Sequence, residues 1–181
     1  TWVIDPLDGT TNFAHSLPQV AVSVALWQQN CIEMGWVYLP ILGEMFQASR
    51  GQGAFCNDRP IRVSRQTDLE QALIATGFPY SVRERINEIM PAFSAALSQT
   101  RGLRRMGSAA VDLAYTACGR FDGFYELGLK PWDTAAGWLL VEEAGGSVTQ
   151  MDPVEAYCLG ADSILASNGL IHEALAACIA P

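Results

Sequence analysis

Two carboxylates near the start of the chain have a spacing that suits a cation site. Asp5 ends an apolar segment, residues 2–4, that predicts a short strand, and Pro6 cannot continue the hydrogen-bonded ladder. Asp8 follows three residues later, and Gly9 permits a tight turn. Two carboxylates so spaced can point at one place, and their oxygens suit a hard divalent cation such as Mg²⁺. A simpler alternative is a turn at Asp8 and Gly9 whose side chains serve only the backbone.

The residues that follow offer groups that could hold a phosphate. Gly9 and Thr10 present backbone N–H groups at a turn or helix N-terminus, where an anion is bound favourably. Far downstream, Asp133 stands at the N-terminus of a helix predicted over residues 134–144. Its carboxylate is either an ordinary N-cap or, if the fold brings it to the first two, a third cation ligand. The small residues at 135–137 would let this helix pack closely beneath the site.

The pattern around these residues predicts a mixed α/β (α+β) fold. Residues 1–68 show mainly the runs and turns of an antiparallel meander, and beyond residue 68 strands and helices alternate. Pro91 is expected to kink one of these helices or divide it into two. Strands are predicted at residues 2–4, 20–27, 33–38, 44–49, 54–56, 61–63, 72–76, 124–127, 147–151 and 163–166, and helices at 84–97, 108–118, 134–144 and 170–179.

The composition excludes several classes of protein. Of 181 residues, 50% are hydrophobic and 17% are charged, which excludes intrinsic disorder. The net charge of −8 argues against direct binding of nucleic acid, because an acidic surface repels its backbone. No apolar run reaches the roughly 20 residues of a membrane span. The five scattered cysteines, without a CxxC pair, indicate reduced, mostly buried thiols in a cytoplasmic protein.

Two motifs resemble the signatures of the inositol monophosphatase family, the Mg²⁺-dependent, lithium-sensitive sugar phosphatases. They are Asp-Pro-Leu-Asp-Gly-Thr-Thr-Asn-Phe at residues 5–13 and Pro-Trp-Asp-Thr-Ala-Ala-Gly at 131–137. Similar stretches between them, such as Arg-Met-Gly-Ser-Ala-Ala, extend the resemblance over essentially the whole chain. It implies a layered α-β-α-β-α sandwich of the sugar phosphatase type. Residues 1–68 would be the C-terminal part of the antiparallel-sheet subdomain, and 69–181 a mixed α/β subdomain, each with one metal motif.

The resemblance also implies a set of metal ligands. Asp5 would be shared between two Mg²⁺ ions, and the backbone carbonyl of Leu7 would be a further ligand. Asp8 and Asp133 would bind the second ion, and the family uses two or three ions. Since these cations supply the positive charge, we expect the site itself to lack positively charged residues.

Further residues are assigned by the same resemblance to the substrate. Gly9 and Thr10 would hold the phosphate through backbone amides, and the Thr10 hydroxyl would help to orient the attacking water. Ser108 and Ala109 would lie near the sugar hydroxyls, with Glu126 as a hydroxyl acceptor. Asp133 is expected both to touch the substrate and, with Asp5, Asp8 and Thr10, to take part in catalysis.

The implied activity is Mg²⁺-dependent hydrolysis of a phosphate monoester, without a covalent enzyme intermediate. The favoured substrate is myo-inositol monophosphate; alternatives are fructose-1,6-bisphosphate, histidinol phosphate or NADP, or a non-catalytic regulatory role. We expect a small phosphorylated substrate as the partner, a homodimer, and no direct contact with nucleic acid or membrane. Other catalytic motifs are missing, and His15 and His172 are too few and too far apart for a zinc site. His172 is expected at the surface.

One part of the family pattern is missing from this sequence, and the role of one basic cluster is open. The family has a Glu-Glu motif and an Asp upstream of the first Asp motif; Glu142 and Glu143 belong to a downstream helix and cannot replace them. We therefore expect an N-terminally truncated chain that binds the first metal weakly. The basic cluster of Arg101, Arg104 and Arg105 is either a solvated strand edge or a subunit contact.

Overall fold

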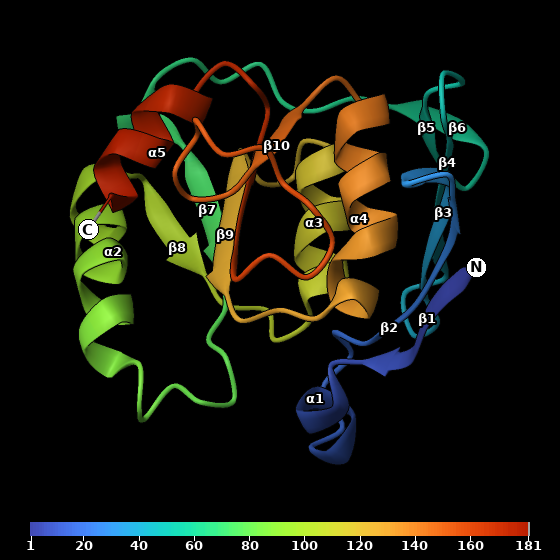
Figure 1. Ribbon diagram of the computed structural model, residues 1–181, viewed down its shortest axis with the longest axis horizontal. Helices are drawn as coiled ribbons and strands as arrows, with labels where there is room; N and C mark the ends of the chain where they lie inside the picture. Colours follow the sequence, from blue (N-terminus) through green and yellow to red (C-terminus); the bar gives the residue numbers. More distant parts are fainter. Residues whose placement is uncertain (181) are drawn as a thin grey trace.

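The computed structural model describes residues 1–180 and begins with a six-stranded antiparallel sheet (Figure 1). Its strands follow one another in chain order, as a meander does. Buried and less buried residues alternate along β2 and β4, because one face of the sheet packs on the core and the other does not. The strands are β1 (Trp2–Asp8), β2 (Ala21–Gln28), β3 (Cys31–Leu39), β4 (Glu44–Ser49), β5 (Ala54–Cys56) and β6 (Arg59–Ile61).

A second, mixed sheet is built from the rest of the chain, in the order β10-β11-β9-β7-β8. Strand β7 is parallel to both β8 and β9, whereas β11 is antiparallel to β9 and β10. The strand β8, which lies at the edge and had not been predicted, carries Arg104, so a strand edge is confirmed for this arginine. The strands are β7 (Leu73–Thr76), β8 (Gly102–Arg104), β9 (Gly123–Leu127), β10 (Ser147–Thr149) and β11 (Ser163–Ser167).

Helices separate the two sheets and cover the second one. Figure 1 shows α3 and α4 side by side between the sheets, and α2 with α5 on the far side of the second sheet. The described residues thus form the layers β-α-β-α, one helical layer fewer than the expected α-β-α-β-α sandwich, and they confirm the mixed, layered fold class. The helices are α1 (Thr10–Ala14), α2 (Ile86–Gln99), α3 (Ala109–Ala117), α4 (Pro131–Glu143) and α5 (His172–Ile179), with a 3₁₀ turn at Leu69–Gln71.

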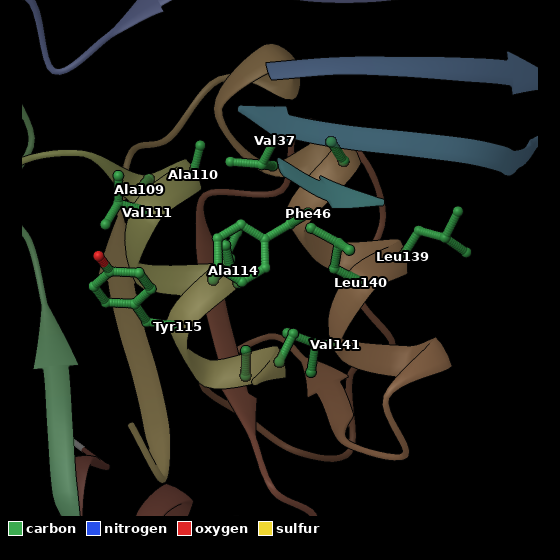
Figure 2. Packing of buried hydrophobic residues seen from close by; sticks show 14 of the residues in the cluster. Val37, Phe46, Ala109, Ala110, Val111, Ala114, Tyr115, Leu139, Leu140 and Val141 are labelled. Carbon is green, nitrogen blue, oxygen red and sulfur yellow. The ribbon is translucent and has the colours of Figure 1, made fainter. Parts of the chain in front are cut away.

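The main core lies between the first sheet and the helix pair α3–α4. Phe46 and Val37 of the sheet meet Ala114, Leu139 and Leu140 of the helices there (Figure 2). The predicted close packing of the small residues in α4 is confirmed at two positions, which fixes this helix beneath the site. A Cβ at position 137 would lie 2.5 Å from the Leu113 Cβ on α3, and one at position 35 would lie 3.0 Å from the backbone of Ala136.

Local expectations were met only in part. Pro91 does not divide its helix, since α2 continues through it, and a kink at this position stays a prediction; the proline is exposed, while Ile89 and Ala92 of the same helix are buried. His172 is buried rather than at the surface, because its ring nitrogens lie 2.9 Å from the Thr149 hydroxyl and 2.8 Å from that of Ser167. All five cysteines are free as expected, yet none is fully buried.

Within residues 1–180, no helix is both long and apolar enough to cross a membrane. The first sheet falls within residues 1–68 and the second within 69–181, the division expected from the sequence. That this division separates two subdomains stays a prediction.

Candidate active site

The first motif forms the end of β1 and a bulge. The register with β2 shifts between Asp5, which pairs with Ser23, and Asp8, which pairs with Ala21. Inside the bulge the Leu7 N–H donates to the Asp5 carboxylate at 2.9 Å. Pro6 lacks an N–H, so the irregular segment costs the ladder no hydrogen bond at that position. The bulge thereby brings two carboxylates three residues apart to one end of the strand.

Helix α1 starts directly after the bulge. Gly9 is its N-cap and has φ +84°, a left-handed conformation that favours glycine; a Cβ there would also lie 2.7 Å from the Gln19 carbonyl oxygen. The Thr10 hydroxyl donates to the Leu7 carbonyl at 3.1 Å. Asn12 anchors the short helix, because its side-chain amide donates to the backbone carbonyl of Gln19 at 2.7 Å and to that of Met106 at 2.8 Å.

Asp8 is held by the N-terminus of α3, about a hundred residues later in the chain. One carboxylate oxygen accepts the Ser108 hydroxyl at 2.8 Å and the Ala110 N–H at 2.7 Å. Ser108 is also the N-cap of α3 and accepts the Val111 N–H at 3.3 Å. Burial nevertheless raises the pKa of Asp8 above its usual value, against these hydrogen bonds and together with the charge of Asp5.

Asp133 reaches the same place from α4. It is the third residue of the helix rather than its N-cap, which is Lys130, so the expected helix start was three residues too late. Pro131 explains the earlier start, because the first helical position needs no N–H. The Asp133 carboxylate accepts the Lys130 N–H at 2.7 Å. Burial, and then the charges of Asp8 and Asp5, raise the pKa of Asp133 to about 6.

The three carboxylates converge. Asp5, Asp8 and Asp133 each offer an oxygen, and these oxygens lie within 4.8 Å of one another. Such a set of hard oxygen donors matches the coordination preference of Mg²⁺. Burial above all, and the charges of the neighbouring acids to a lesser extent, raise the pKa values of Asp8 and Asp133, and a bound cation would favour their charged forms. The residues present therefore fit a divalent metal ion.

A cavity of about 900 Å³ opens beside this cluster, and every site residue expected from the sequence lines it. Glu126, from β9, is 8% exposed, and burial raises its pKa to about 8, helped by Asp8 and Asp133 and opposed by Arg105. Gly77 leaves room for this carboxylate, since a Cβ there would lie 2.1 Å from a Glu126 oxygen. The expected residues are Asp5, Leu7, Asp8, Gly9, Thr10, Ser108, Ala109, Glu126 and Asp133.

The cavity also contains charged residues that were not assigned to the site from the sequence. The expectation of a site without positive charge was wrong, since Arg83, Arg105 and Lys130 all line the cavity. Arg105 lies over the Phe78 ring, 5.8 Å from its centroid. Asp112 of α3 completes the acidic wall. Nothing local marks these positions, because the fold gathers them from segments far apart in the sequence.

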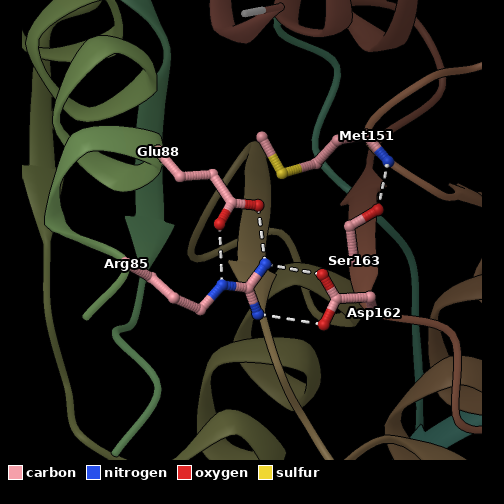
Figure 3. A network of polar contacts seen from close by, with 5 residues as sticks. All are labelled: Arg85, Glu88, Met151, Asp162 and Ser163. Carbon is pink, nitrogen blue, oxygen red and sulfur yellow. Dashed lines mark hydrogen bonds and ion pairs between the residues drawn. The ribbon is translucent and has the colours of Figure 1, made fainter. Parts of the chain in front are cut away.

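An ion-pair network holds the segment that forms one wall of the cavity, residues 77–83. Just after this segment, Arg85 pairs with Glu88 of α2 and with Asp162, which precedes β11 (Figure 3). Its guanidinium nitrogens lie 2.6 and 2.9 Å from the two Asp162 oxygens. These hydrogen bonds raise the pKa of Arg85 and lower that of Asp162. The wall is thus tied both to α2 and to the second sheet.

Comparison with known proteins identifies the family to which the chain belongs. The family model "Inositol monophosphatase family" matches residues 1–180, and the chain belongs to this family. It is 46% identical over 181 residues to the inositol-1-monophosphatase of Synechocystis sp., covering 99% of this chain and 62% of that protein. It is also 46% identical over 176 residues to the Nus factor SuhB of Escherichia coli K12, covering 97% of this chain and 66% of that protein.

A solved structure shares the fold. The inositol monophosphatase of Anabaena (Nostoc) sp. PCC 7120 superposes with a TM-score of 0.95 at 45% identity, over 98% of this chain and 70% of that one. The chain therefore spans about two thirds of the length of the relatives it matches.

Proposed function

We propose that the protein hydrolyses a small phosphate monoester with the help of Mg²⁺, and that myo-inositol monophosphate is the favoured substrate. The observation that carries this proposal is the convergence of Asp5, Asp8 and Asp133 at a cavity with an acceptor, Glu126, in its wall. Membership of the inositol monophosphatase family supports the same reaction class, as does the similarity to a relative named inositol-1-monophosphatase.

We propose the roles of the residues from the family resemblance. Asp5, Asp8, Asp133 and the Leu7 carbonyl would hold two or three Mg²⁺ ions. When bound, these ions neutralise the phosphate and lower the pKa of a water molecule. Thr10 can give up its hydrogen bond to the Leu7 carbonyl and orient the attacking water.

The rest of the site would hold the substrate. The backbone N–H groups of Gly9 and Thr10 lie at a helix N-terminus, which suits the phosphate. Glu126 would accept a hydroxyl of the polyol, and Ser108 and Ala109 would contact the same part of the substrate. The residue assignments derive from the family resemblance and agree with the positions of these side chains in one cavity.

The test measures phosphate release from a panel of substrates by the chain and its Asp8→Asn variant. The panel contains myo-inositol 1-phosphate, fructose-1,6-bisphosphate, histidinol phosphate and NADP, each with Mg²⁺ and with or without Li⁺. We expect inositol phosphate to be the best substrate, Li⁺ to inhibit, and Asp8→Asn to lower the rate about a hundredfold or more. Asp58→Asn is the control, since Asp58 is exposed in a turn outside the cavity with φ +62°, which asparagine tolerates. Release from none of the four substrates would contradict the proposal.

A second candidate is a regulatory role, which the similarity to proteins named Nus factor SuhB favours. In this case the chain would bind a transcription complex, with or without phosphatase activity. Asp133→Asn separates the two functions, because it removes a metal ligand and leaves most of the surface unchanged. Retained binding of the complex together with lost phosphate release would show that the two functions are independent.

We further propose a homodimer in the cytoplasm, with no direct contact with nucleic acid or membrane. The reduced cysteines and the acidic composition support the location and the lack of nucleic-acid binding. Light scattering after size-exclusion chromatography measures the mass directly; a monomer at micromolar concentration would contradict the dimer.

A further inference from the structure

Asp112 is a buried carboxyl group that is not one of the three converging carboxylates. It lies in the first turn of α3, is 1% exposed, and lines the cavity. Neither of its carboxyl oxygens has a hydrogen-bond partner among the described residues. Buried polar groups are nearly always paired, and an unpaired one destabilises the fold. Asp112 therefore lowers the stability of the fold, and the residues that share the cavity with it indicate what its carboxyl group does there.

The rest of α3 shows that packing alone does not require this carboxyl. Every residue of the helix, Ala109–Ala117, is buried, and most are alanine, valine or leucine. An apolar side chain at position 112 would fill the same place without an unpaired polar group. Stability given up in this way is typical of residues that serve a site.

Glu126 is the charged group that acts most strongly on Asp112. Burial, followed by the charges of Glu126 and Asp8, raises the pKa of Asp112 well above its usual value, against a smaller effect of Arg105. Asp112 and Glu126 are both buried and both line the same cavity. Two carboxyl groups in such a place cannot both ionise easily, and the one that keeps its proton is a hydrogen-bond donor.

We propose that Asp112 is a positioning residue for Glu126. Its carboxyl O–H donates to a Glu126 carboxyl oxygen through one buried water, and so holds this acceptor toward a hydroxyl of the substrate. Asp112 then determines how well the site recognises the alcohol part of a phosphate ester, and it leaves the metal cluster to act on the phosphate. This inference rests on the proposed function, in which Glu126 accepts a substrate hydroxyl.

The experiment compares two phosphate esters that differ in their leaving groups. myo-Inositol 1-phosphate carries hydroxyls that Glu126 can accept, and p-nitrophenyl phosphate carries none. For the inositol ester, we expect Asp112→Ala to raise KM about tenfold, and Asp112→Asn, which keeps one donor, to raise it about threefold. For the aryl ester, kcat/KM should stay within about twofold of the wild type.

Stability and a matched control separate positioning from a structural role. Removal of the unpaired carboxyl should leave the Tm of Asp112→Ala equal to or above that of the wild type. Thr116→Val is the control, because Thr116 is buried one turn later on α3 and its hydroxyl donates to the Asp112 backbone carbonyl at 2.9 Å. This control should leave KM unchanged for both esters. Equal losses on both esters with a lower Tm in the Asp112 variants would overturn the proposal.

Two further measurements test the link to Glu126. In a Glu126→Gln background, Asp112→Ala should no longer change the KM for the inositol ester; independent, additive effects would overturn the proposal. Loss of the donor should also raise the pKa of Glu126 by about one unit in a ¹³C NMR titration, because the hydrogen bond favours its charged form. If the wild type hydrolyses neither ester, the proposed function fails, and the titration alone then decides on Asp112: an unchanged Glu126 pKa overturns the positioning role.

Discussion

Replacement of Glu126 by glutamine should make the metal-free protein more stable at alkaline pH. Glu126 lies on β9 in the wall of the cavity and is 8% exposed. Burial raises its pKa from 4.5 to about 8, with Asp8 and Asp133 adding to the shift against the opposing charge of Arg105. Glutamine keeps the shape of the side chain and cannot ionise, so the variant removes this titration and little else.

The sign and size of the effect follow from linkage. Because the folded pKa lies above the unfolded one, Glu126 contributes stability that is fully present below pH 4.5 and is lost as the pH rises through about 8. In this window the free energy of unfolding falls by about 1.4 kcal/mol per pH unit. Between pH 6 and pH 8 the loss amounts to about 2 kcal/mol, since the slope flattens close to the folded pKa. Total stabilities of domains are about 5–15 kcal/mol, so this change is measurable.

Urea unfolding at pH 6, 7 and 8 in the presence of a chelator measures the effect, with tryptophan fluorescence as the signal. Other groups that titrate in the same range are common to both proteins and cancel in the difference, apart from the coupling of Asp8 and Asp133 to Glu126, which is part of the Glu126 shift itself. The gap in unfolding free energy between Glu126→Gln and wild type should therefore grow by about 2 kcal/mol, in favour of the variant, from pH 6 to pH 8. Glu70→Gln, at an exposed site outside the cavity, reports the effect of losing an acid elsewhere.

A gap that stays constant over this pH range would refute the reasoning. It would mean that Glu126 titrates near its ordinary pKa, and hence that water or a cation reaches its carboxylate more easily than its burial indicates. A gap that grows in the opposite direction would mean that a positive group pairs with Glu126. Arg105 is the charged residue that already acts in this sense.

Three further predictions concern packing and metal binding. Gly35→Ala should lower the unfolding free energy by about 1–3 kcal/mol, because its Cβ would lie 3.0 Å from the Ala136 backbone. Urea titration measures this change, and an unchanged midpoint would contradict the close contact. Gly77→Ala should displace the Glu126 carboxylate, because one of its oxygens would lie 2.1 Å from the new Cβ. The KM for inositol phosphate should then rise with little change in Tm. An unchanged KM would count against Glu126 as the acceptor. Saturating Mg²⁺ should raise the Tm of the wild type but not that of Asp133→Asn; equal shifts would place the ion elsewhere.

The sequence predicted the metal-binding side of the site better than the wall opposite. Asp5 and Asp8 belong to one short motif, so their types and spacing alone indicate a cation site. The link to Asp133 came from the family resemblance, and the structure shows its physical basis in α4, which packs against β1 and β2. The fold class was equally accessible, because alternation along the strands and helical spacing after residue 68 are local properties.

The residues that were missed depend on contacts between distant segments. Asp112 has the sequence context of an ordinary polar residue in a helix, and only packing of α3 between two sheets makes it buried and unpaired. Arg105 follows an edge strand and was considered as part of a solvated edge or a subunit contact; it is exposed, and it also lines the cavity, over the ring of Phe78. His172 likewise becomes buried because β10 and β11 supply hydroxyls to both of its ring nitrogens. Local patterns carry no information about such partners.

The protonation states of the acids in the cavity depend on burial, on one another and on a bound cation. Burial raises the pKa of Asp8, Asp112, Glu126 and Asp133 together, so the metal-free fold holds its acidic groups partly by protonating them. A cation bound among the first-motif acids and Asp133 would take over this role, and its binding must then release protons and weaken as the pH falls. Asp112 lies outside the set of three converging carboxylates, and burial raises its pKa well above the usual value, which favours its protonated form. The same cavity thus contains acids suited to bind a cation and one suited to donate a hydrogen bond, and their burial and neighbours determine the difference.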